Sequence, residues 1–131
     1  MKTIPEKFRN LLEDNVKALA FLATVMDDGT PQVTPVWFSA ADGHILINSA
    51  KGRVKDRNMR ARPDVALTIM DLGKPYRYLQ IRGTVVEITE EGANEHINAL
   101  SHKYRGHDYD FTPGQVRVIY KIRPESVSAD D

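Results

Sequence analysis

The chain has 131 residues, which is enough for one domain and too few for two of ordinary size. Its 18 Lys and Arg balance its 18 Asp and Glu, which argues against a protein that coats nucleic acid or an anionic membrane by bulk charge. The absence of Cys excludes disulfides, thiolate nucleophiles, iron–sulfur clusters and cysteine-based zinc sites. We therefore expect a single domain over residues 1–131 with local binding sites, and no nucleic acid or membrane as partner.

The sequence also lacks the signals of membrane insertion and secretion. Its longest apolar run, residues 18–25, is far shorter than the ~20 residues of a membrane-spanning helix. Residues 1–14 carry charges throughout and contain no apolar stretch of a secretory signal. These features predict a cytoplasmic protein.

The first half of the chain predicts a short helix followed by a meander of strands. Apolar residues at helical spacing behind Pro5 indicate an amphipathic helix over residues 6–14. From residue 19 the apolar period changes to two, and turn sequences separate strands predicted over residues 19–26, 32–39 and 44–49. Connections this short allow only antiparallel pairing.

The second half predicts two helices and three further strands. A helix over residues 54–61 ends at Arg62, because the residue before Pro63 disfavours helical backbone. Gly83 lies inside a long strand and predicts a bend or a close approach of two backbones. The remaining elements are strands over residues 64–71, 76–89 and 115–123, a helix over 90–104, a polar loop over 105–114 and a frayed tail over 128–131.

Six strands joined mostly by tight turns favour a mainly β fold with a minor α part, an antiparallel barrel or sandwich. A barrel of this size is filled by its own side chains. A large ligand must therefore lie on its outside or in a groove completed by a second subunit.

The most informative stretch is the basic segment 51–62, which holds six of the 18 Lys and Arg and a single acid. Asn48 precedes it at a strand end, and Gly52 lets the backbone approach a ligand. The helix that follows presents its N-terminal N–H groups to negative charge, and Arg53 and Arg57, at i and i+4, are predicted to grip one anion together. A basic helix that serves only solubility, or one that binds nucleic acid, is the alternative.

Two other strands carry candidate binding faces. In residues 34–37, Pro35 cannot donate to a β-ladder, so it marks an edge, a bulge or a place where the backbone faces a ligand, beside the aromatic wall of Trp37. Trp37 is alternatively an ordinary edge-strand residue. In the long strand, Tyr78 and Gln80 point away from the core and predict either a ligand groove or a plain dimer contact.

The histidines, glycines and carboxylates of the sequence form no recognisable metal, nucleotide or catalytic motif. His96, His102 and His107 lack the spacing of metal ligands, so no metal is expected. Glycine-rich nucleotide motifs and an evident carboxylate pair do not occur, and the sequence assigns no catalytic residue. The loop over residues 105–114 is either a mobile wall over a substrate or an ordinary surface connection.

Four segments in order, residues 20–24, 28–38, 55–63 and 83–85, together with a closing strand at 122–125, carry a family resemblance. They resemble the pyridoxamine 5′-phosphate oxidase-like superfamily, and within it the small flavin/deazaflavin oxidoreductases that use F420. The resemblance spans nearly the whole chain. It implies a six-stranded antiparallel split β-barrel with short flanking helices, of the FMN-binding type, that forms a homodimer with its cofactor sites at the subunit interface.

The resemblance also implies a set of cofactor-binding residues. The phosphate and acidic tail are expected at Lys51, Arg53, Lys55 and Arg57, with Asn58 holding their turn. The ring system is expected against Thr34, Pro35, Val36, Trp37, Asn48 and Ser49, with Tyr78 and Gln80 approaching from the long strand. Residues 34–37 stand where the vitamin-oxidase branch carries an arginine motif, which argues against pyridoxamine phosphate oxidase activity itself.

The charge of the basic segment favours F420 over FMN as cofactor. FMN carries one phosphate, whereas F420 carries a phosphodiester and a polyglutamate tail, and six cations in twelve residues match the longer anion better. The expected reaction is hydride transfer between deazaflavin and a small unsaturated or quinone-like acceptor, with Tyr78, Tyr104 or water as proton donor. An FMN-binding flavoprotein, a non-enzymatic carrier of a flavin, deazaflavin or tetrapyrrole, and a module that docks an acidic partner stay open.

Overall fold

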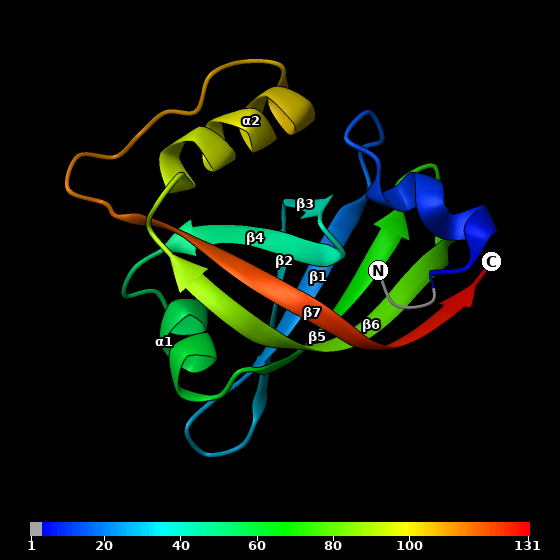
Figure 1. The fold of residues 1–131 in the computed structure, drawn as a ribbon, viewed down its shortest axis with the longest axis horizontal. Helices are drawn as coiled ribbons and strands as arrows, with labels where there is room; N and C mark the ends of the chain where they lie inside the picture. Colours follow the sequence, from blue (N-terminus) through cyan, green and yellow to red (C-terminus); the bar gives the residue numbers. More distant parts are fainter. Residues whose placement is uncertain (1–3) are drawn as a thin grey trace.

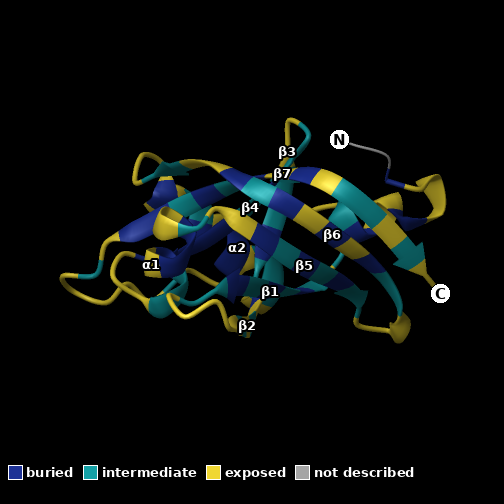
Figure 2. Ribbon diagram, turned by 90° about the horizontal axis from the view of Figure 1, so that it is seen from below, coloured by how far each residue is buried: buried dark blue, intermediate teal, exposed yellow. Residues whose placement is uncertain are grey.

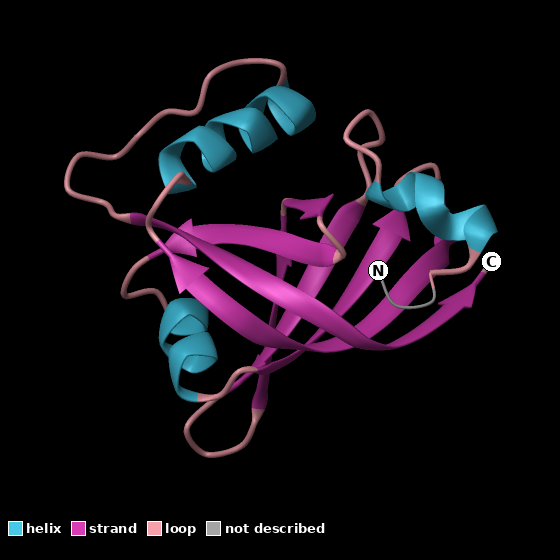
Figure 3. Ribbon diagram, in the orientation of Figure 1, coloured by secondary structure: helices cyan, strands magenta, loops and turns pink. Residues whose placement is uncertain are grey.

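A computed structural model describes residues 4–131 as a curled antiparallel sheet with short helices around it (Figures 1 and 3). The elements are η1 (Glu6–Leu12), β1 (Leu19–Val25), β2 (Pro31–Val36), β3 (Phe38–Ala41), β4 (His44–Ala50), α1 (Val54–Ala61), β5 (Asp64–Asp71), β6 (Lys74–Thr89), α2 (Ala93–Arg105) and β7 (Arg117–Asp130). The sheet order is β2-β1-β5-β6-β7-β4-β3, and all neighbouring strands are antiparallel. The predicted split-barrel fold is confirmed, with seven strands in the described residues where six were predicted.

The extra strand arises because Trp37 interrupts the strand predicted over residues 32–39. β2 and β3 are the outermost strands at opposite ends of the sheet order, yet Trp37 alone separates them along the chain. Two peptide steps span at most about 7.6 Å, so the two sheet edges come together at this residue. We call the line along which edge strands β2 and β3 meet the seam of the barrel. Pro35 lies in edge strand β2, where its missing N–H costs no ladder hydrogen bond.

Buried and more exposed residues alternate along the strands (Figure 2), and apolar side chains fill the interior. Ile45 and Ile47 of β4 and Leu79 and Ile81 of β6 are completely buried, as are Tyr120 and Ile122 of β7. Since the barrel interior is occupied, the pockets of the described residues lie on its outer surface.

The long strand β6 crosses β7 closely at Gly83, as the sequence predicts. A Cβ atom at this position would lie 2.4 Å from the carbonyl oxygen of Arg123, which is inside van der Waals contact. The ladder shifts register here, with Gly83 opposite Pro124. Only glycine therefore allows the two strands to bend across one another.

The carboxyl end differs from its prediction. The sequence predicts a last strand that ends at Arg123 and a frayed tail over residues 128–131, but β7 continues to Asp130. Its final residues pair with the outer part of β6, from Arg82 opposite Ser126 to Tyr78 opposite Asp130. The prediction is wrong because β6 is 16 residues long and offers an edge beyond the Gly83 crossing.

Among the described residues, no helix combines the length and apolar character needed to cross a membrane.

Candidate functional site

Helix α1 begins at a glycine turn that follows β4. It covers Val54–Ala61, which confirms the range predicted from sequence. Gly52 has a φ of +94°, in the region where other residues are strained, and it turns the chain out of β4. The N-cap residue Arg53 has extended backbone, and no side chain caps the helix. The first turn of α1 therefore keeps N–H groups that favour a bound anion.

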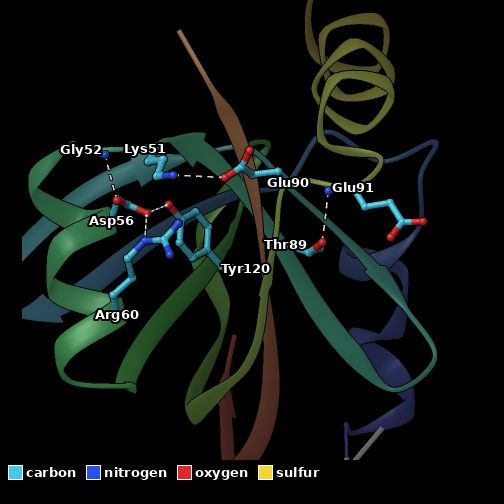
Figure 4. A network of polar contacts seen from close by, with 8 residues as sticks. All are labelled: Lys51, Gly52, Asp56, Arg60, Thr89, Glu90, Glu91 and Tyr120. Carbon is cyan, nitrogen blue, oxygen red and sulfur yellow. Dashed lines mark hydrogen bonds and ion pairs between the residues drawn. The ribbon is translucent and has the colours of Figure 1, made fainter.

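A buried carboxylate holds this turn in place (Figure 4). Asp56 is 2% exposed and accepts hydrogen bonds from the Gly52 N–H at 2.8 Å, from Arg60 Nε at 2.9 Å and from the Tyr120 hydroxyl. Burial acts to raise the pKa of Asp56, but the three hydrogen bonds outweigh it and hold that pKa below its ordinary value. Burial and the carboxylate raise the pKa of Tyr120 far above its ordinary value. The side chains of Asp56 and Arg60 thus act as scaffold.

The N-terminal turn of α1 opens onto a pocket of about 390 Å³ at the seam. Its wall comes from β1, β2, the seam, β4, the start of α1, α2, the connection between α2 and β7, and the first residue of β7. The lining residues are Leu19, Pro35, Val36, Trp37, Asn48, Arg53, Lys55, Ile97, Arg105, Tyr109 and Arg117.

Four of the residues that line the seam pocket are cations, and none is an acid. Arg53, Lys55, Arg105 and Arg117 form no ion pair with any carboxylate of residues 4–131. Burial lowers the pKa of Lys55 from its ordinary value, and the neighbouring Arg53 and Arg117 lower it further. Mutual repulsion of these cations is relieved when an anion binds, so the charge of the pocket suits an anionic ligand.

Arg117 is the most enclosed of the four cations, with 5% of its surface exposed. Its Nε donates to Asn48 Oδ1 at 2.9 Å, and its Nη1 donates to Gln115 Oε1 at 3.1 Å and to the Tyr109 hydroxyl at 3.3 Å. Sequence reasoning missed this residue. The sequence showed only that Arg117 is a charged residue on the outward side of the last strand. It did not show that β4, which carries Asn48, pairs with that strand.

His96 of α2 supports the same group of residues. Asn48 Nδ2 donates to the Ala93 carbonyl at 2.9 Å and to His96 Nδ1 at 3.1 Å, and His96 Nε2 lies 2.9 Å from the Ser39 hydroxyl. Burial, and secondarily Arg117, lower the pKa of His96 from 6.5 to about 4. His96 is therefore neutral near pH 7, with Nδ1 as acceptor and Nε2 as donor toward Ser39.

Aromatic rings form the wall of the pocket at the seam. Trp37 stacks on Tyr104 with centroids 5.4 Å apart and planes 4° apart, and the Arg105 guanidinium lies 4.8 Å from the Trp37 ring centre. The Tyr104 hydroxyl donates to the Ala18 carbonyl at 2.6 Å, and burial raises the pKa of Tyr104 to about 12. A hydroxyl engaged in this way is poorly suited to donate a proton, so Tyr104 supports the Trp37 ring from behind the pocket wall.

The structure brings together about half of the residues predicted to bind a cofactor. Pro35, Val36, Trp37, Asn48, Arg53 and Lys55 line the seam pocket. Thr34, Ser49, Lys51, Arg57, Asn58, Tyr78 and Gln80 do not line it.

Strand alternation removes Ser49 from the pocket. Ser49 is 1% exposed and shares the inward face of β4 with Ile47, so it points away from the face that carries Asn48. Thr34 lies on the same face of β2 as Val36 but is not among the residues that line the pocket. The hydroxyls of Ser49 and Thr34 are buried without a hydrogen-bond partner among the described residues.

The basic segment is divided between several roles. Lys51 forms an ion pair of 3.3 Å with Glu90 (Figure 4), and Asn58 donates to Thr24 Oγ1 at 3.0 Å, which ties α1 to β1. Arg57 lines a separate pocket with Asp27 and Asp28. Arg53 lines the seam pocket and Arg57 does not, so their joint grip on one anion stays a prediction.

Tyr78 and Gln80 lie on the outward face of β6, as predicted, but neither lines the seam pocket. They pair with Asp130 and Ser128 of β7. Strands β5 and β1 separate these two residues from the pocket residues of β2.

A curled split barrel with an anion pocket at its seam defines a class of small cofactor-binding barrels. The family model described as "Pyridoxamine 5′-phosphate oxidase" matches residues 4–129, and the chain belongs to this family. Among solved structures, one named "F420 Reductase" is 34% identical, with 95% of this chain and 98% of that chain covered and a TM-score of 0.84. Family and neighbour support a flavin- or deazaflavin-type oxidoreductase.

More distant structures share the fold. A conserved hypothetical protein from Mycobacterium tuberculosis is 22% identical over 98% of this chain and 86% of its own, with a TM-score of 0.75. HupZ from Group A Streptococcus is 20% identical over 97% of this chain and 94% of its own, with a TM-score of 0.69. No curated protein sequence matches the chain.

Proposed function

We propose that the protein is an F420-dependent oxidoreductase that transfers a hydride between the deazaflavin and a small unsaturated or quinone-like acceptor. The observation that carries this proposal is the seam pocket, which joins an aromatic wall to four cations without an acid. A flat ring with an anionic tail has the matching chemistry. The solved structure named F420 Reductase, at 34% identity, supports the same cofactor.

The cations around α1 are distributed as a long anion requires. Arg53, Lys55 and the uncapped N–H groups of α1 bind the phosphodiester. Lys51 and Arg57 lie outside the seam pocket on either side of this turn, where they meet an extended acidic tail. The single phosphate of FMN is too short to extend from the seam pocket to these outer cations, which favours F420.

A homodimer completes the site in this proposal. Tyr76, which is 86% exposed, marks the outward face that also carries Tyr78 and Gln80. Val33 on edge strand β2 is 63% exposed. Exposed apolar and aromatic side chains of this kind are typical of an interface. In the dimer, Tyr78 and Gln80 of the partner approach the ring at the seam pocket.

The bound deazaflavin supplies the hydride chemistry. The protein's own residues bind the anionic tail, orient the ring against Trp37 and exclude water from the seam pocket. No side chain is required as a nucleophile. Because the Tyr104 hydroxyl is engaged with Ala18, Tyr78 of the partner or water delivers the proton.

Titration of the purified protein with oxidised F420 and with FMN tests the proposal. We expect saturable binding of F420 that is tighter than binding of FMN, one site per subunit, and hydride transfer to a panel of quinones and enones. Tighter binding of FMN would assign the protein to the flavoprotein branch. Binding without turnover would identify a carrier, and binding of neither cofactor would end the proposal.

A further inference from the structure

We propose that Arg117 forms a second anion-binding subsite in the seam pocket, separate from the cations of α1, and that it takes an oxyanion borne on a flat ring. The subsite rests on the proposed function, because both use the same pocket. It adds a requirement on the ligand: besides its phosphate, the occupant of the pocket carries a negatively charged oxygen on its planar part.

The first reason is that the charge of Arg117 is buried and uncompensated. The three groups that accept its hydrogen bonds are Asn48, Gln115 and Tyr109, and all are neutral. Its Nη2 makes no hydrogen bond to a residue of the described chain, 4–131. A buried guanidinium is normally matched by a carboxylate because burial of an unpaired charge is costly. The cost is recovered when a ligand provides the missing negative charge.

The second reason is that the guanidinium is held rigidly. Asn48 is 9% exposed, and its amide nitrogen is used by Ala93 and His96, so only its oxygen faces Arg117 Nε. Tyr109 and Gln115 hold Nη1 from the loop side. Nη2 is thus left as a fixed donor, and a donor that is already oriented loses little entropy when it binds a ligand.

The surroundings of Arg117 select the kind of anion. The guanidinium lies 5.2 Å from the centre of the Tyr109 ring, and Trp37 and Ile97 line the same pocket. Flat and apolar walls favour a ring that carries the charge, whereas the polar turn around Arg53 suits a phosphate. The ring oxyanion belongs either to the cofactor itself or to an aromatic or enolic substrate.

Titration with two simple anions tests the subsite without any cofactor. Benzoate represents a ring-borne oxyanion, and inorganic phosphate represents the tail. We expect both to bind the wild-type protein at once, and benzoate to shift the Arg117 Nε–H resonance. Arg117→Gln should weaken benzoate at least about tenfold and change phosphate affinity by less than about twofold. Arg123→Gln, an exposed arginine of the same strand, is the matched control and should change neither.

Two measurements keep the test decisive if Arg117→Gln does not fold. Arg117→Lys retains the charge but loses the contacts to Asn48 and Tyr109, and should weaken benzoate by a smaller factor. The resonance experiment needs no variant. An Arg117 signal that benzoate leaves unmoved, or displacement of benzoate by phosphate, would overturn the subsite.

Repeating the benzoate titration with cofactor-loaded protein identifies the source of the oxyanion. Loss of benzoate binding assigns the subsite to the cofactor ring, and retained binding assigns it to the substrate. Failure of F420 and FMN to bind, with benzoate still dependent on Arg117, ends the proposed function and leaves the subsite. If a cofactor binds but benzoate affinity does not depend on Arg117, the proposed function stands and the subsite is refuted.

Discussion

Asp56 and Arg117 are both buried charges near the start of α1, yet their surroundings are opposite. Asp56 is met by a cation, a hydroxyl and a backbone N–H, whereas Arg117 is met by neutral groups alone. A charge that the protein has satisfied contributes to the scaffold, because its removal leaves donors without an acceptor. A charge that the protein has left unsatisfied is available to a ligand. The comparison assigns Asp56 to the stability of the fold and Arg117 to ligand binding, although the two residues lie in one small region.

The largest expected effect is on stability, at the satisfied charge. Asp56→Asn should lower the free energy of unfolding by about 3 kcal/mol, because it removes the negative charge that pairs with Arg60 and places an NH2 donor where the Gly52 N–H needs an acceptor. Denaturant unfolding measures this change. Glu87→Gln, which removes an exposed ion pair with Lys121, is the control and should cost less than about 0.5 kcal/mol. Equal losses for the two variants would show that Asp56 is no scaffold.

A pH effect comes next, at His96 beside the unsatisfied charge. The pKa of His96 is lowered from 6.5 to about 4 in the folded protein. Between these pH values the unfolded chain binds a proton that the folded protein does not, so stability falls as the pH drops from 6.5 to 4. We expect this contribution to be roughly 2 kcal/mol after solvent screening is allowed for.

Unfolding of wild type and His96→Gln at a series of pH values measures the contribution of His96. The difference between the two proteins should be constant above pH 7 and change across the window from 6.5 to 4. Parallel profiles throughout that window would mean that His96 titrates normally in the folded protein.

Loss of Lys55 should affect binding and spare stability. Lys55→Ala is expected to weaken phosphate or F420 about tenfold, with the loss shrinking at high salt. The free energy of unfolding should stay level or rise slightly, because repulsion from Arg53 and Arg117 disappears. Lys7→Ala, an exposed lysine paired with Asp131, serves as control. A stability loss above about 1 kcal/mol would place Lys55 in the scaffold instead.

The smallest effect is expected at Tyr104. Tyr104→Phe removes the hydrogen bond to Ala18 and keeps the ring against Trp37, so it should cost about 1 kcal/mol of stability. The rate of hydride transfer and its pH profile should not change. A large loss of rate with unchanged cofactor affinity would restore Tyr104 as proton donor.

Local sequence signals account for the elements and for which strand faces point outward. The range of α1 is predictable because a pre-proline residue ends it and a glycine turn starts it, all within a dozen residues. The outward side of Tyr78 follows from the apolar period of two. Pro35 predicts an edge strand because proline has no backbone N–H to donate to a neighbouring strand. Such signals depend on residues that are close together along the chain. The family resemblance assigned roles to residues only by their place in the sequence, without showing which of them meet in space.

The seam pocket depends on contacts that no local pattern contains. Arg117 meets Asn48 across 69 positions of sequence, because sheet closure places β7 beside β4. Trp37 ends a strand only because the two sheet edges meet there. Whether a buried charge is satisfied depends on groups that arrive from distant elements. The contrast between Asp56 and Arg117 therefore arises only once the barrel closes.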